Sequence, residues 1–73
     1  MDIKYGTTVV DKNNRFIGRI NKVILDMWSG EPRKYAVRLE GEVGMVFFTP
    51  HQVDTADADS VKLNLVMEEI EKA

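Results

Sequence analysis

The chain is short and carries little net charge: it has 73 residues, of which 44% are hydrophobic and 30% charged, and a formal net charge of −2. A chain of this size buries only about 60% of its unfolded surface, so we expect one domain over residues 1–73 that gains stability from a partner subunit. The absence of cysteine excludes disulfides, and a single histidine leaves no ordinary set of zinc or iron ligands.

The first predicted element is a β-hairpin. A short strand at 9–10 and a long strand at 16–25 are rich in β-branched and aromatic residues. The Asn13-Asn14 pair between them tolerates the left-handed backbone of a tight turn. After the second strand, Asp26 can accept hydrogen bonds from backbone N–H groups ahead of it and Gly30 can take a positive φ. We therefore expect a sharp reversal there and a third strand beyond it.

The apolar residues of the long strand change face partway along it. Phe16 and Ile20 share one face of a period-2 element, whereas Val23 and Leu25 share the other. This shift predicts a bulge or bend near Asn21-Lys22, of the kind that turns a strand around a barrel corner.

The rest of the chain alternates as strands until its last residues. The pattern predicts a strand with one wet face at 34–40, a strand that is apolar on both faces at 43–48 and ends at Pro50, a polar loop at 54–60, and a strand at 61–65.

The tail Val66–Ala73 places apolar residues at i, i+4 and i+7 among acidic ones, which predicts a short amphipathic helix that must dock on the sheet. The expected fold is therefore mainly β, a small antiparallel β-barrel with a short C-terminal helix. The expected core consists of Phe16, Ile20, Val23, Leu25, Tyr35, Val37, Leu39, Val61 and Leu63.

A series of short motifs follows the order found in one known family. It runs through Gly6, Val9-Val10-Asp11, Asn13-Asn14, Ile17-Gly18, Val23-Ile24-Leu25-Asp26, Ser29-Gly30, Tyr35 to Leu39, Met45 to Phe48 and Pro50. In this order and spacing the chain resembles the PRC-barrel domain family, as a stand-alone member with no fused domain. The resemblance implies an interaction module of the kind seen in reaction-centre assembly, ribosome maturation and cell division, and it implies no catalytic residues.

The residues themselves also favour a protein that is not an enzyme. His51 has Ser29 and Ser60 as potential partners, but neither serine lies in a nucleophile elbow. The acidic residues of loop 54–60 lack the glycine and the ligand spacing of a calcium loop. We therefore expect no catalytic residue, no metal site and no cofactor.

Surplus apolar surface predicts a protein interface. Within 43–48, either Met45 and Phe47 or Val46 and Phe48 must face outward. Trp28 lies in a turn, where a core role is hard to arrange. The predicted interface consists of Trp28, Met45, Phe47, Val66, Met67 and Ile70. The alternative is that the tail helix covers this surface within the same chain.

Charge is distributed unevenly along the chain. Residues 1–38 carry eight Lys or Arg against four Asp or Glu, whereas residues 39–73 carry two against eight. These opposite charges can meet across neighbouring strands, each exposed pair contributing tenths of a kcal/mol. The alternative is a nucleic-acid-binding face, in which the basic residues are Arg15, Arg19, Lys22, Arg33, Lys34 and Arg38.

Together these patterns predict a non-catalytic adaptor that binds other proteins and forms a homodimer, for example within a cell-division assembly. An RNA- or ribosome-associated assembly factor is the alternative function. No apolar segment approaches the ~20 residues of a transmembrane helix, and the N-terminus lacks the basic and apolar regions of a signal peptide. We therefore expect a cytoplasmic protein that does not insert into membranes.

Overall fold

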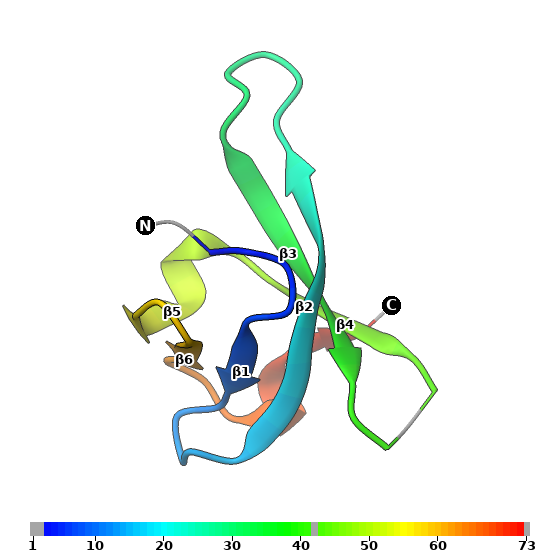
Figure 1. The fold of residues 1–73 in the computed structure, drawn as a ribbon, viewed down its shortest axis with the longest axis vertical. Helices are drawn as coiled ribbons and strands as arrows, with labels where there is room; N and C mark the ends of the chain where they lie inside the picture. Colours follow the sequence, from blue (N-terminus) through cyan, green and yellow to red (C-terminus); the bar gives the residue numbers. More distant parts are fainter. Residues whose placement is uncertain (1–2, 42, 73) are drawn as a thin grey trace.

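The computed structural model describes residues 3–41 and 43–72 and contains one seven-stranded sheet in the order β5-β6-β1-β2-β3-β4-β7 (Figure 1). The strands are β1 (Thr8–Val10), β2 (Phe16–Leu25), β3 (Pro32–Leu39), β4 (Met45–Phe48), β5 (Val53–Ala56), β6 (Ser60–Leu63) and β7 (Glu71–Lys72). Two 3-10 turns, η1 (Pro50–Gln52) and η2 (Met67–Glu69), lie in the second half of the chain.

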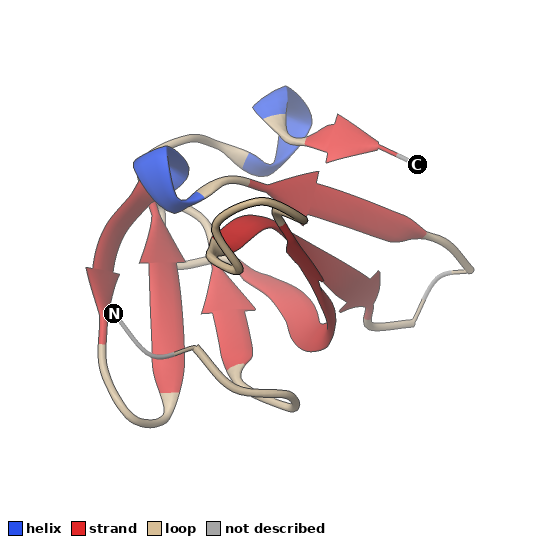
Figure 2. Ribbon diagram, turned by 90° about the horizontal axis from the view of Figure 1, so that it is seen from above, coloured by secondary structure: helices blue, strands red, loops and turns tan. Residues whose placement is uncertain are grey.

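The sheet curls into a half-barrel around its core, as the view from above shows (Figure 2). Neighbouring strands are antiparallel except for β1 and β6, which run parallel because a long stretch of chain separates them. In the described part of the chain, β5 and β7 form the two edges of the sheet. The predicted mainly β class is confirmed, whereas closure into a barrel stays a prediction.

The predicted first hairpin is confirmed, and its turn uses the expected chemistry. Thr8–Val10 pairs antiparallel with β2, and Asn14 has a φ of 64° in the turn between them. At the other end of β2, Gly30 has a φ of 74° and its N–H donates to the Asp26 carbonyl oxygen at 2.8 Å. Left-handed backbone is easiest for Gly and tolerated by Asn, so these two positions define the reversals.

The predicted irregularity in β2 is also confirmed. The register against β3 shifts between Ile20 and Lys22, so Asn21 is the extra residue that bends the strand. A second shift lies between Ile24 and Leu25. Close to the first bend, a Cβ atom at Gly18 would collide with the carbonyl oxygen of Arg38 on β3. A glycine is therefore required where these two strands approach most closely.

The core contains most of the expected residues, and the rings of Tyr35 and Phe48 stack at its centre with centroids 5.0 Å apart. Its buried members are Ile3, Val9, Ile17, Ile20, Tyr35, Val37, Val46, Phe48, Val61, Leu63 and Ile70. Val23 and Leu39 pack against this cluster while partly exposed.

The prediction of Phe16 and Leu25 as core residues is wrong. Phe16 is 43% exposed, because a register shift against β1 directs Ile17 rather than Phe16 toward the core. Leu25 is 56% exposed, because it follows the second shift in β2 and lies on a hairpin that projects beyond the core.

The sequence left open which face of β4 points toward the core, and the structure answers this. Val46 and Phe48 are buried, and Met45 and Phe47 are half-buried on the outer face. After η1, the region 54–60 is not entirely a loop, because Val53–Ala56 forms an edge strand paired with β6. Its sequence mixes strand-favouring Val53 and Thr55 with Asp54 and Ala56, which are depleted in strands, so pairing with β6 decides its conformation.

The predicted C-terminal helix is wrong over the described residues, and Ala73 lies outside them. Met67–Glu69 forms a 3-10 turn, Ile70 is buried in the core, and Glu71–Lys72 pairs antiparallel with β4 as strand β7. A helix of eight residues has too few internal hydrogen bonds to persist in water. Strand pairing with β4 satisfies the same backbone groups while placing Ile70 in the core.

Candidate protein-interaction site

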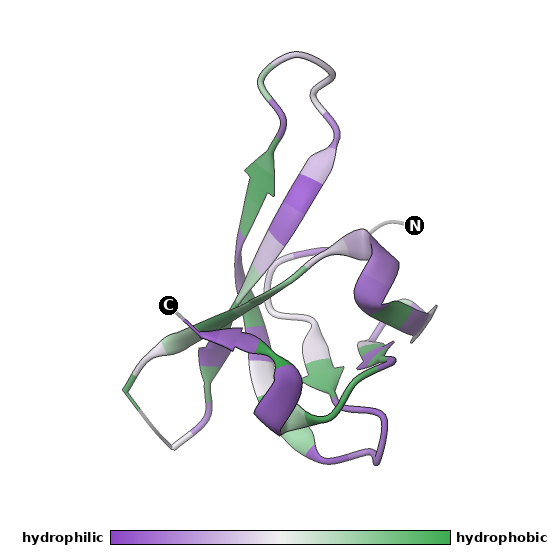
Figure 3. Ribbon diagram, turned by 180° about the vertical axis from the view of Figure 1, so that it is seen from behind, coloured by the Kyte–Doolittle hydropathy of each residue, from purple (hydrophilic) through white to green (hydrophobic). Residues whose placement is uncertain are grey.

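The β2–β3 hairpin ends in an exposed apolar tip that projects from the half-barrel (Figure 1). In this hairpin tip, residues 25–31, Trp28 is 93% exposed, Met27 is 92% exposed and Leu25 is 56% exposed. The hydropathy colouring shows the apolar end of β2 beside the polar start of β3 (Figure 3). Clustered large apolar side chains on a projecting element are typical of a contact surface.

Hydrogen bonds hold the hairpin tip in one conformation. The Asp26 Oδ1 atom accepts hydrogen bonds from the backbone N–H groups of Trp28 at 2.8 Å and Ser29 at 3.0 Å. The Glu31 N–H donates to Ser29 Oγ at 3.2 Å. The backbone N–H groups of Ser29 and Trp28 hold the pKa of Asp26 below its ordinary value. Because these hydrogen bonds order the backbone of the tip, less backbone entropy is lost when it binds.

A second apolar feature lies at the other end of β3. It is a hollow of about 370 Å³ between β4 and the C-terminal segment. Its apolar lining includes Leu39, Val43, Met45, Val46 and Met67, and its charged lining residues are Glu68 and Lys72. We call it the apolar hollow. Val43 is fully exposed at this site, so the apolar surface continues outside the hollow.

The structure therefore divides the predicted interface between two places. Trp28 lies in the hairpin tip, whereas Met45 and Met67 line the apolar hollow. Phe47 is half-buried on the outer face, where the Lys34 Nζ atom lies 5.8 Å from its ring centroid.

The tail residues of the predicted interface need one correction. Val66 is half-buried. Ile70 is 4% exposed and belongs to the core, so its side chain is not available to a partner. The helical spacing assumed for the tail had placed it on the surface.

The basic residues separate into paired and unpaired groups. Arg15 forms an ion pair with Glu68, and Lys34 forms one with Glu71, each at 2.8 Å. Both basic residues are therefore paired with acidic residues of the C-terminal segment. Arg33 lies near Asp26 in the hairpin. The remaining three, Arg19, Lys22 and Arg38, are exposed and have no ion pair among the described residues.

A buried carboxylate that the sequence reading missed joins the first hairpin to the C-terminal segment. Asp11 is 0% exposed, and its oxygens accept backbone N–H hydrogen bonds from Asn13, Arg15 and Met67. Burial alone would raise the pKa of Asp11, but these hydrogen bonds outweigh it and the pKa lies below its ordinary value. The Arg15 Nε atom also lies 3.5 Å from Asp11 Oδ2, so the carboxylate is held by backbone N–H groups and by one ion pair, which indicates a structural role.

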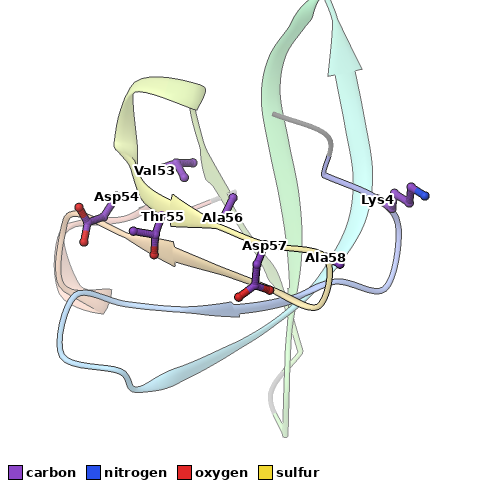
Figure 4. Close-up of a pocket in the computed structure, with 7 residues that line it drawn as sticks. All are labelled: Lys4, Val53, Asp54, Thr55, Ala56, Asp57 and Ala58. Carbon is purple, nitrogen blue, oxygen red and sulfur yellow. The ribbon is translucent and has the colours of Figure 1, made fainter.

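A further hollow, of about 540 Å³, lies along β5 and has polar and charged lining residues (Figure 4). Lys4, from the N-terminal segment, is one of them. The Asp57 carboxylate accepts the N–H groups of Asp59 and Ser60, which makes it a turn-forming residue. Nowhere in residues 3–41 and 43–72 do three His, Cys, Asp or Glu side chains come together as a metal site would require.

His51 and Ser29 line one open hollow of about 340 Å³ beside η1. Among the described residues, no hydrogen bond joins their side chains, and Ser29 Oγ accepts the Glu31 N–H instead. A serine without a hydrogen-bonded base is a weak nucleophile.

The fold and these surfaces define a small β half-barrel domain with an apolar hairpin tip. Comparisons of the chain with known protein families and with curated proteins give no match. The PRC-barrel resemblance therefore rests on the motif order alone. Within the described chain, no helix has the length and apolar character needed to cross a membrane.

Proposed function

We propose that this PRC-barrel-like domain is a non-catalytic protein-interaction module that self-associates and serves as an adaptor in a cytoplasmic assembly such as the cell-division machinery. The observation that carries the proposal is the ordered hairpin tip, which exposes Leu25, Met27 and Trp28. Tryptophan side chains at ordered, projecting positions are among the strongest contributors to protein interfaces.

The energetics of a small domain favour the same conclusion. Exposure of three large apolar side chains costs solubility and adds nothing to the stability of the isolated fold. A 73-residue chain is also near the size limit for folding alone. Binding at the hairpin tip would bury the exposed side chains and stabilise the folded state by mass action.

We expect the melting temperature of the wild-type protein to rise with protein concentration, because association stabilises the folded state. The Trp28→Ala variant should melt at one temperature over the same range. The matched control is Tyr5→Ala, since Tyr5 is 69% exposed but lies outside the hairpin tip. Calorimetry over a hundredfold concentration range checks this result. A wild-type melting temperature independent of concentration would contradict the proposed self-association.

A second candidate function rests on the outer face of β2 and β3. Arg19 lies directly opposite Arg38 in the register, and Lys22 lies opposite Ala36 in the neighbouring row. Like charges directly opposite each other destabilise a sheet unless an anion binds between them. The exposed ring of Phe16 on the same strand is available for stacking. These residues support a single-stranded RNA site, the alternative to the adaptor role.

RNA binding through this face should depend steeply on salt. If Arg19, Lys22 and Arg38 each contact one phosphate, the logarithm of affinity should fall with the logarithm of salt concentration with a slope of about −2. Arg38→Ala should reduce that slope by about 0.7, whereas Lys12→Ala, at an exposed position in the first turn, should leave it unchanged. Fluorescence anisotropy with a labelled single-stranded RNA measures both slopes. Lack of binding at low salt would exclude this alternative.

A further inference from the structure

We infer that the hairpin tip of one copy inserts into the apolar hollow of a second copy, with Trp28 as the buried anchor. This inference rests on the proposed self-association and names the two surfaces that make the contact. The tip is an exposed apolar projection, and the hollow is an exposed apolar concavity on the same chain.

The tip cannot fill the hollow of its own chain. Pro32 begins β3 next to the tip, and Leu39 ends β3 at the hollow. Seven residue steps of about 3.3 Å separate them, a distance of about 23 Å along an extended strand. In Figure 1 the tip of the β2–β3 hairpin lies at the top, whereas the end of β3, where Leu39 lines the hollow, lies toward the bottom. Each is therefore left for another molecule.

The size and lining of the hollow suit an aromatic anchor. Its volume of about 370 Å³ is near the lower end of the range of about 300 to 1,000 Å³ for small-ligand pockets. Met45 and Met67 line it, and flexible thioether side chains adapt to an inserted ring with favourable sulfur–aromatic contacts. By contrast, the larger hollow beside β5 has Val53 as its one large apolar lining residue among the described residues and three charged ones, Lys4, Asp54 and Asp57.

One unpaired charge on each surface is complementary to the other. The charged lining residues of the hollow are Glu68, which is paired with Arg15 at 2.8 Å, and Lys72. Glu31 lies in the hairpin tip, three residues after Trp28. Neither Lys72 nor Glu31 has an ion pair within the described residues. In the inserted arrangement the Glu31 carboxylate can approach the Lys72 ammonium of the other copy, which favours a second copy as the occupant.

The contact joins two different surfaces of the same chain. Copies linked in this way either exchange tips reciprocally in a closed dimer or continue head to tail. Trp28 enters the same hollow in both arrangements, so a test of that single contact applies to each.

The test uses two complementary variants. Trp28→Ala keeps the hollow but removes the anchor, and also removes the only tryptophan of the chain. Val43→Glu keeps the anchor and places in the hollow a carboxylate that can pair with Lys72 and repel Glu31 of the other copy; Val43 is fully exposed, so this change should leave the fold intact. Circular dichroism melting of both variants verifies that they fold. Each variant alone should self-associate at least about 30-fold more weakly than the wild type.

The decisive measurement is a titration of Trp28→Ala into Val43→Glu, monitored by tryptophan fluorescence. Only the tip of Val43→Glu contains tryptophan, and its emission should shift to shorter wavelength as the indole enters the hollow of the added variant. Titration with the double variant Trp28→Ala, Val43→Glu is the control and should produce no shift.

Two different negative results of these experiments would lead to different conclusions. If the wild type self-associates but the titration leaves the emission unchanged, the contact between tip and hollow is overturned while self-association stands. If the wild type remains monomeric at high micromolar concentration, both this inference and the proposed self-association are overturned.

Discussion

Replacing Phe48 with alanine should lower the free energy of unfolding by about 3 to 5 kcal/mol. Phe48 is 1% exposed and stacks on Tyr35 at the centre of the core, so truncation leaves a cavity as well as lost burial. Total stabilities of small domains lie at about 5 to 15 kcal/mol, and a large part of this one would be lost. Urea denaturation followed by circular dichroism measures the change.

The matched control is Phe16→Ala, which removes the same atoms from a half-exposed ring on β2. Its cost should stay below about 1.5 kcal/mol, because much of the ring is already in water. Equal losses for the two variants would contradict the observed core and restore the prediction that Phe16 is buried.

Replacing Asp11 with alanine should cost about 3 kcal/mol or more. The change removes the acceptor of three backbone N–H groups, those of Asn13, Arg15 and Met67, at a fully buried position. It also releases the C-terminal segment that carries Ile70 into the core. Asp59→Ala is the control, because Asp59 is exposed. A small loss for Asp11→Ala, comparable to that for Asp59→Ala, would exclude the structural role.

The lowered pKa of Asp11 determines whether the stability of the protein rises or falls with pH. A carboxyl group whose folded pKa lies below its unfolded value contributes full stability above the unfolded pKa, about 3.9, and loses it as the pH falls through the folded pKa. Stability should therefore decrease below about pH 4. At neutral pH the Asp11→Asn variant should be less stable than the wild type, and it should lose less stability on acidification. Part of the loss should remain, because the pKa values of Asp26 and Asp57 are also lowered.

Local chemistry explains which elements could be predicted from the sequence. The predicted and observed bounds of β2 are the same, because both of its ends are defined by turns with strong signals. Asn14 and Gly30 adopt the positive φ that these turns require. The bend at Asn21 was also visible, because the apolar pattern reverses at that point.

The errors arise where tertiary contacts overrule the local pattern. Phe16 and Leu25 were assigned to the core by alternation, but the register shifts beside them change which side chain faces inward. The C-terminal segment has helical spacing, yet it pairs with β4 and inserts Ile70 into the core. β4 lies far from the C-terminal segment in the sequence, so the local spacing carries no signal of that pairing.

Several residues of the candidate site were predicted from the sequence, but their arrangement in space was not. Trp28, Met45 and Met67 were identified as surplus apolar side chains, and the structure places the first in the hairpin tip and the other two in the apolar hollow. Their separation depends on the length and direction of β3. The role of Asp11 was missed although its signal was present, since an Asp two residues before Asn13 is well placed to accept turn N–H groups.

Sedimentation equilibrium of the wild type beside Trp28→Ala tests the central claim most directly, namely that the hairpin tip mediates self-association. The wild type should have an apparent mass that rises above the 8.3 kDa of one chain as concentration increases, while Trp28→Ala should stay at that mass. A wild-type mass of 8.3 kDa at every concentration, or equal association by both proteins, would contradict the claim.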